Sequence, residues 1–201
     1  MPIRTVTVMM LGCLAVLPAW AQGEILVDYR DERMLDFANP GQWLPIAERI
    51  GGEVEVLGEA QGAYTAAGAD EIAYLVSDSA PPASDPFPEV SQRIVVFAGD
   101  EQVADWALPA DGVFDRLVTG ADLDGDGISE VIAEGSFYNM GTSATSLSAI
   151  RVGETPEVIQ TLSDVYVDSC EAGVGEQAIT ASAVRVSDGQ LVAEPETLDC
   201  V

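Results

Sequence analysis

Short apolar segments with period-two alternation recur from residue 53 onward, and this recurrence limits the fold more than any other feature. Residues 70–76 (DEIAYLV) resemble residues 129–133 (SEVIA), and each segment follows a glycine-containing loop. Fifty-nine residues separate Glu71 from Glu130, which marks a repeat. Because an alternating segment buries only one face, such units must pack against one another. The pattern therefore predicts a mainly β fold built from antiparallel units.

Each unit is expected to contain a hairpin, because two alternating segments lie on either side of a short turn signal. The three predicted hairpins pair 94–97 with 102–104, 148–152 with 158–159, and 182–186 with 191–192. The last hairpin turns at Asp188-Gly189, a dipeptide typical of type I′ turns. Two polar stretches, the proline-rich 77–90 and the Ser/Thr-rich 137–146, are predicted to be long loops and are candidate partner-binding segments.

Residues 53–201 are therefore predicted to form one β-repeat domain of about three units. Three units are too few for an ordinary closed propeller, which has about four to eight blades. We expect a partial propeller of blade-like units or a sandwich. Residues 22–52 are expected to form a partly helical segment that packs on the sheet. It would contain a strand at 24–29, helical spacing at 31–37, and a second helix at 42–50 that ends at two glycines.

Residues 1–21 have the features of an export signal. Arg4 precedes an apolar run, and residues 19–21 (AWA) have the small residues required for cleavage, which we expect before Gln22. The run is too short to span a bilayer, and no second long apolar stretch follows it. The alternatives are a short N-terminal anchor and a lipoprotein signal at Cys13. We predict an exported protein, periplasmic or extracellular, whose mature chain has no membrane span.

Two cysteines, Cys170 and Cys200, remain after the predicted cleavage removes Cys13. An even pair in an exported protein favours a disulfide. In the chain-entropy model, a bridge that closes a loop of about 30 residues stabilises the fold by roughly 3–4 kcal/mol. The alternative is two free thiols. A catalytic cysteine is disfavoured because the chain has no histidine to activate it.

The composition excludes several classes of function. The chain has 34 acidic residues, 8 arginines, no lysine and no histidine, for a net charge of −26. Nucleic acids and anionic lipids would be repelled by such a surface, so we predict no nucleic-acid partner. Without histidine or lysine, Ser-His-Asp catalysis, Schiff-base chemistry and imidazole-bound zinc are not available.

One loop, residues 122–130 (DLDGDGISE), carries a specific chemical pattern. Alternate residues in a tight loop turn their oxygens inward, and Ca²⁺ takes six to eight oxygen ligands. The expected ligands are Asp122, Asp124, Asp126, the backbone carbonyl of Ile128, and Glu130, which would bind directly or through water. An EF-hand would need a bidentate Glu at position 12, where this chain has Ala133. The sequence therefore predicts a calcium loop that leads into a β-strand.

The segment from Gly120 to Glu134 resembles the FG-GAP/VCBS-type repeat of integrin-like β-propellers and many exported bacterial proteins. In that family a D-x-D-x-D-G-x-x-[DE] loop precedes an apolar strand and holds Ca²⁺. The resemblance implies a calcium-stabilised β-blade and often a surface or adhesion role, but no particular ligand or reaction. The corresponding loop of the first unit, residues 64–71, lacks the three aspartates, so we expect one ion only.

The predicted affinity is that of other extracellular modules, with a Kd on the order of 10⁻⁴–10⁻³ M. The alternatives are Mg²⁺ or Mn²⁺ at the same loop, or an acidic turn without a specific ion. We predict no enzymatic activity and a structural, adhesive or ligand-binding role with a protein or glycan partner. Phe137 and Tyr138 are aromatic candidates for stacking on a sugar or peptide. The alternative function is a carboxylate-dependent hydrolase with a structural calcium.

Overall fold

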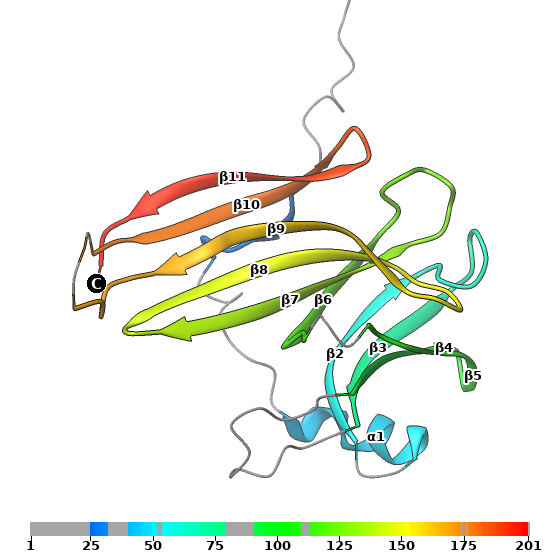
Figure 1. The fold of residues 1–201 in the computed structure, drawn as a ribbon. Helices are drawn as coiled ribbons and strands as arrows, with labels where there is room; N and C mark the ends of the chain where they lie inside the picture. Colours follow the sequence, from blue (N-terminus) through cyan, green and yellow to red (C-terminus); the bar gives the residue numbers. More distant parts are fainter. Residues whose placement is uncertain are drawn as a thin grey trace, which may run out of the picture.

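The computed structural model describes residues 25–31, 40–51, 54–78, 91–109, 113–173, 175 and 177–200. Within these residues the chain is mainly β, with antiparallel strands in two sheets and one short α-helix (Figure 1). The four-stranded sheet has the order β2 (Glu55–Gly62), β3 (Glu71–Ser77), β4 (Gln92–Ala98) and β5 (Glu101–Ala107). The mainly β, antiparallel prediction is confirmed.

The second sheet has seven strands and curls strongly. It runs from β6 (Arg116–Ala121) through β7 (Glu130–Asn139), β8 (Thr142–Arg151) and β9 (Glu157–Asp168) to β10 (Ile179–Ser187), which also pairs with β11 (Gln190–Leu198) and β1 (Ile25–Asp28). One edge of β10 pairs with β11, and β9 and β1 share the other edge. Residues of β6 and β10 pack into one core cluster, so the sheet is nearly closed and barrel-like.

The predicted repeat appears in the strand register. Gly62 on β2 pairs with Glu71 on β3, and Ala121 on β6 pairs with Glu130 on β7. The two glutamates therefore hold the same place in two antiparallel units, β2–β5 and β6–β9. The third predicted unit is not separate, because the β10–β11 hairpin pairs with β9 and extends the second sheet. The described residues form no propeller, so the expectation of a partial propeller is wrong.

The two units pack through their first strands and a shared core. At Gly58 on β2 the backbones come so close that a Cβ atom would lie 2.6 Å from the Leu117 carbonyl oxygen on β6, which explains the glycine. The shared core lies between the sheets and includes Leu75, Ile94 and Ile150. Burial of these apolar side chains is the main force that holds the units together.

Each sheet also buries its other face. In the first sheet Tyr74 and Phe97 face a cluster that includes Trp43, Ile46 and other residues of the preceding helical segment. That segment comprises a 3₁₀ turn, η2 (Pro40–Trp43), and α1 (Leu44–Ile50). In the second sheet the residues that alternate with the shared core, such as Ile132, enter a cluster enclosed by the curl of the sheet. Strands β3 and β4 and the first half of β7 are thus buried on both faces, which accounts for their near-continuous apolar runs.

A hairpin replaces one of the two predicted long loops. Residues 137–146 belong to β7 and β8, which pair from Val131↔Ile150 to Asn139↔Thr142. Met140 and Gly141 have φ values of 51° and 86°, as a type I′ turn requires. The loop prediction was wrong because polar Ser, Thr and Gly were read as loop residues. The three predicted hairpins, including the turn at Asp188-Gly189, are confirmed.

Several predictions fall outside the described residues. These are the export signal at 1–21, the helical spacing at 31–37 apart from Asp31, and the proline-rich loop at 77–90 beyond residue 78. Within the described part of the chain, α1 and η2 are both far shorter than a membrane-spanning helix.

The predicted disulfide is confirmed. Cys170 and Cys200 are bonded, with their Cα atoms 5.7 Å apart. Cys170 follows β9 and Cys200 follows β11, so the bond joins the ends of two strands that both lie beside β10. It fastens the last described residues of the chain to the second sheet.

A buried polar network ties the N-terminal strand to the second sheet. Tyr29, directly after β1, donates a 2.8 Å hydrogen bond from its hydroxyl to Glu134 Oε2 on β7. Arg116 Nε on β6 lies 2.8 Å from the other oxygen of Glu134. Burial, together with the charge of Glu134, raises the pKa of the Tyr29 hydroxyl, which stays protonated as the donor.

Candidate metal site

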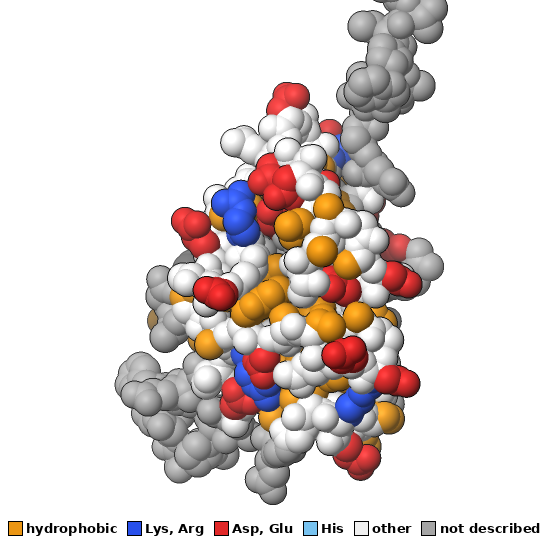
Figure 2. All heavy atoms as spheres, turned by 90° about the vertical axis from the view of Figure 1, so that its right-hand side faces the viewer, with side chains coloured by type: hydrophobic (Ala, Val, Ile, Leu, Met, Phe, Trp, Pro, Cys, Tyr) orange, Lys and Arg blue, Asp and Glu red, His pale blue; other side chains and the backbone are white. Residues whose placement is uncertain are grey.

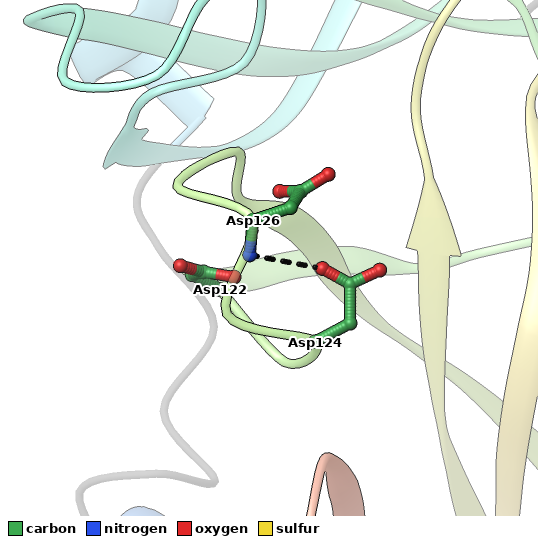
Figure 3. A group of neighbouring side chains, drawn as sticks. All are labelled: Asp122, Asp124 and Asp126. Carbon is green, nitrogen blue, oxygen red and sulfur yellow. Dashed lines mark hydrogen bonds between the residues drawn. The ribbon is translucent and has the colours of Figure 1, made fainter.

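The three predicted aspartate ligands gather on one exposed loop between β6 and β7. Figure 3 shows Asp122, Asp124 and Asp126 on the same turn. Each contributes a carboxylate oxygen to a group whose members all lie within 4.8 Å of one another. Three negative charges at this distance repel one another, and a divalent cation among them would reverse that repulsion. This cluster can hold a metal ion.

The loop's own backbone shapes the cluster. Asp122 accepts hydrogen bonds from the N–H groups of Gly125 (2.8 Å) and Gly127 (3.0 Å). The two glycines have φ values of 78° and 88°, a conformation that other residues rarely adopt. Asp124 accepts from the Asp126 N–H at 3.2 Å, the bond marked in Figure 3. These backbone hydrogen bonds and the two glycine conformations hold the turn so that its three aspartates lie close together.

The remaining two predicted ligands are placed differently. Ile128 donates its backbone N–H to Asp126 at 2.7 Å, and ligation by its carbonyl stays a prediction. Glu130 is 3% exposed and accepts a 2.9 Å hydrogen bond from the Leu123 N–H. Its carboxylate is not among the oxygens that group within 4.8 Å. Glu130 is thus a buried acceptor for the backbone of the loop, and its ligation of an ion, direct or through water, stays a prediction.

Arg151 is the residue of this site that the sequence analysis missed. It is on β8, next to Ile150, which pairs with Val131 on β7. Its Nη2 lies 3.2 Å from Asp124 Oδ2, and its Nε lies 3.7 Å from Glu130 Oε1. The register of the β7–β8 hairpin places Arg151 opposite Glu130, and this register was the signal that could have found it. One guanidinium partly offsets the negative charge of the loop.

Burial changes the acidity of Glu130. Loss of water contact, with the nearby charge of Asp124, holds the pKa of Glu130 above its usual value despite the hydrogen bond from Leu123. Ionising this carboxyl therefore costs more in the folded protein than in the unfolded chain, and a nearby cation would lower that cost. The arrangement favours a bound positive charge.

The loop of the first unit holds its glutamate at the same backbone position but lacks the aspartates. Glu71 accepts hydrogen bonds from the N–H groups of Tyr64 (2.6 Å) and Thr65 (2.9 Å) and from the Thr65 hydroxyl. Tyr64 lies seven residues before Glu71, as Leu123 lies seven residues before Glu130. The described residues include no metal-type cluster at this first loop, in keeping with the loss of the three aspartates.

The two loops also touch each other. The Ser129 N–H donates to the Ala63 carbonyl at 2.7 Å, and the Ala63 N–H donates to the Ser129 hydroxyl at 3.2 Å. An ion in the second loop would therefore stiffen the junction between the two sheets.

Figure 2 shows red acidic side chains scattered over one face of the molecule and few blue arginines, as the net charge requires.

No family model, curated protein or solved structure matches the chain. The likeness of residues 120–134 to the FG-GAP/VCBS-type repeat therefore stays a prediction from those residues.

Proposed function

We propose that this is an exported, calcium-stabilised β protein with a structural, adhesive or ligand-binding role and no catalytic activity. One Ca²⁺ would be held by Asp122, Asp124 and Asp126, with the Ile128 carbonyl and Glu130 completing its oxygen shell. The observation that supports this most is the group of three carboxylates whose oxygens lie within 4.8 Å of one another on one turn.

The ligand set favours calcium over the alternatives. Carboxylate and carbonyl oxygens suit hard cations, and the irregular geometry of a nine-residue loop suits the flexible coordination of Ca²⁺. Mg²⁺ demands near-octahedral geometry and gives up its waters reluctantly. With an extracellular-type Kd on the order of 10⁻⁴–10⁻³ M, the site would be filled where calcium is millimolar.

The role of the ion would be structural. The loop joins β6 to β7, contacts the first unit through Ser129, and receives Arg151 from β8. A cation there would neutralise charge that otherwise opposes packing at the junction of the sheets. The Cys170–Cys200 bond supports export, because such bonds persist in oxidising compartments.

Isothermal titration with CaCl₂ and with MgCl₂ tests the site directly. We expect one Ca²⁺ per chain and at least tenfold weaker Mg²⁺ binding, equivalent to about 1.4 kcal/mol. Asp126→Ala, which removes a ligand oxygen that asparagine would keep, should abolish this binding. The matched control is Asp188→Asn, which removes one charge from another exposed Asp-Gly turn. Equal binding by Asp126→Ala and wild type would refute the site.

A further inference from the structure

Three strands of the second unit are longer than their counterparts in the first, and among the described residues their excess length forms an open groove. β7, β8 and β9 have 10, 10 and 12 residues, whereas β3, β4 and β5 have seven each. Figure 1 shows the ends of β7–β9 extending past the four-stranded sheet. The face that packs on that sheet near Ile150 continues there as a hollow of about 630 Å³. This volume lies within the roughly 300–1,000 Å³ typical of small-molecule sites.

The floor of the groove is lined by hydroxyl groups. Ser146 and Ser148 on β8 and Thr161 and Ser163 on β9 line it, while the alternating Leu147 enters the core on the opposite face. Ser148 is 7% exposed, and its hydroxyl lies 3.0 Å from that of Thr161, with which it shares a hydrogen bond. Each hydroxyl keeps further donor or acceptor capacity. A sheet face that is normally apolar where buried is thus polar and hollow here.

A strained aspartate supplies the single charge of the lining. Asp164 has φ 57° inside β9, where a bulge sets residues 163–165 against Ser146 alone. The other two positive-φ residues besides glycine, Met140 and Asp188, lie in hairpin turns. Bulges of this kind redirect a side chain, and strain of this kind gathers at functional sites. Within the described residues no hydrogen bond or ion pair engages the Asp164 carboxylate.

Apolar side chains form the rim. Phe137 on β7 is 64% exposed and lines the groove, as does Val113, which is 55% exposed. An exposed aromatic ring beside a row of hydroxyls matches a sugar, which has apolar C–H faces and hydroxyl edges. The lining has one carboxylate and no arginine, so an anionic ligand would be repelled.

We propose that this groove binds a short neutral oligosaccharide. The ring of Phe137 would stack on a sugar face, the carboxylate of Asp164 would accept hydrogen bonds from sugar hydroxyls, and the Ser/Thr floor would bind the remaining hydroxyls. This deepens the ligand-binding part of the proposed function by naming the ligand class, but it uses none of the metal-loop residues. A single lining carboxylate supports binding over hydrolysis, which needs a pair.

The test begins with the disulfide-bonded protein in calcium buffer on an array of neutral and acidic oligosaccharides. Cellohexaose, maltohexaose and laminarihexaose are then titrated individually, with oligogalacturonate as the acidic probe. We expect at least one neutral probe to bind and the acidic one not to bind. Phe137→Ala and Asp164→Asn should each weaken binding about tenfold or more. Asparagine tolerates the positive φ of this site, so the second variant keeps the bulge.

Tyr138→Ala is the matched control. Tyr138 is the neighbouring aromatic, 68% exposed, and does not line the groove. The Tyr138→Ala variant should change the glycan affinity by no more than about twofold, which is well under 1 kcal/mol. The proposal is overturned if no neutral glycan binds, if only acidic glycans bind, or if Tyr138→Ala loses as much glycan affinity as Phe137→Ala. The metal site is judged separately by calcium titration, so either idea can fail alone.

Discussion

The loops of residues 61–71 and 120–130 place a buried glutamate at the same backbone position but surround it with different charges and hydrogen-bond donors. In the first, Glu71 receives three hydrogen bonds from Tyr64 and Thr65. In the second, Glu130 receives one, from Leu123, and Asp124 stands where the first loop has Thr65. A hydroxyl donor has thus been replaced by a carboxylate. The first loop is complete with protein atoms alone, whereas the second has excess negative charge that a cation would balance.

The two equivalent glutamates differ in pKa for this reason. Burial acts to raise the pKa of Glu71, but the hydrogen bonds from Thr65 and Tyr64 outweigh it and hold this pKa below its usual value. Burial raises the pKa of Glu130, and its single hydrogen bond from Leu123 does not compensate. The same backbone frame therefore holds a glutamate whose negative charge is well satisfied by hydrogen bonds in one unit and poorly satisfied in the other.

The largest expected difference comes from deleting each glutamate in calcium-free buffer. Glu71→Ala leaves three hydrogen-bond donors without their acceptor, so we expect a loss of about 2–4 kcal/mol. Glu130→Ala leaves one such donor and removes an unfavourable buried charge, so it should cost about 1 kcal/mol or less. Urea unfolding measures both free energies. Equal losses would show that the two loops are not electrostatically different.

Thr65→Val sharpens the comparison at a single hydroxyl. The valine keeps the shape but removes the hydroxyl donor to Glu71, so we expect a loss of about 1–2 kcal/mol and a higher Glu71 pKa. Thr197→Val is a control on β11, in the other sheet. Urea unfolding measures the loss of stability, and carboxyl-carbon NMR titration measures the pKa of Glu71. An unchanged Glu71 pKa would remove the role assigned to Thr65.

The pH dependence of stability should have opposite sign for the two carboxyls when calcium is absent. The folded pKa of Glu71 lies below its unfolded value, so its stabilisation is complete above the unfolded pKa and is lost as pH falls through the folded pKa. The folded pKa of Glu130 lies above its unfolded value, so its contribution is complete below the unfolded pKa and is lost as pH rises through the folded pKa.

Glutamine variants test the sign of this pH dependence for each carboxyl. At about pH 7, Glu71→Gln should melt below wild type and Glu130→Gln above it. The Glu130 difference should shrink toward about pH 4, and the Glu71 difference should shrink only at still lower pH. Melting curves across this range in calcium-free buffer provide the measurement. A Glu130→Gln variant that melts lower at neutral pH would show that its ionised form is stabilised without a cation.

The smallest expected effect is at Arg151. Its side chain is 52% exposed, so Arg151→Gln should cost at most about 0.5 kcal/mol without calcium. The same change removes a competing positive charge, so calcium affinity should rise severalfold, by about 1 kcal/mol or less. Calorimetric titration detects this. Weaker calcium binding in the variant would mean that Arg151 supports the bound state instead of substituting for the ion.

The repeat was predictable from sequence because Glu71 and Glu130 lie in matching segments, and their registers proved equivalent. The aspartate cluster was predictable because its spacing is local. The hairpin at 137–146 was not, because much of it is exposed and so lacks an apolar stripe. The position of Arg151 depends on the cross-strand register, and the burial of Glu130 depends on the packing of the sheets. No local sequence pattern encodes either.

The pairing of β10 with β9 could not be predicted from local sequence patterns either. SAIRV and SAVRV occur at the start of two similar hairpins, so the second was read as a new unit. In the fold, three residues of β10 pair with β9 and three others with β1, so one edge is divided between two partners. Such sharing arises from the curl of the whole sheet.

The most direct test of the account is thermal unfolding in EDTA and then with CaCl₂ or MgCl₂ at equal ionic strength. With about 10 mM Ca²⁺ and the predicted affinity, the linkage relation gives about 1.4–2.7 kcal/mol, or a rise in Tm of roughly 3–10 °C. Asp124→Ala and Asp126→Ala should lose this rise, and Glu101→Gln, which removes an exposed charge on β5, should keep it. No rise, or an equal rise with Mg²⁺, would contradict a calcium-dependent loop and leave only an acidic turn that responds to general screening.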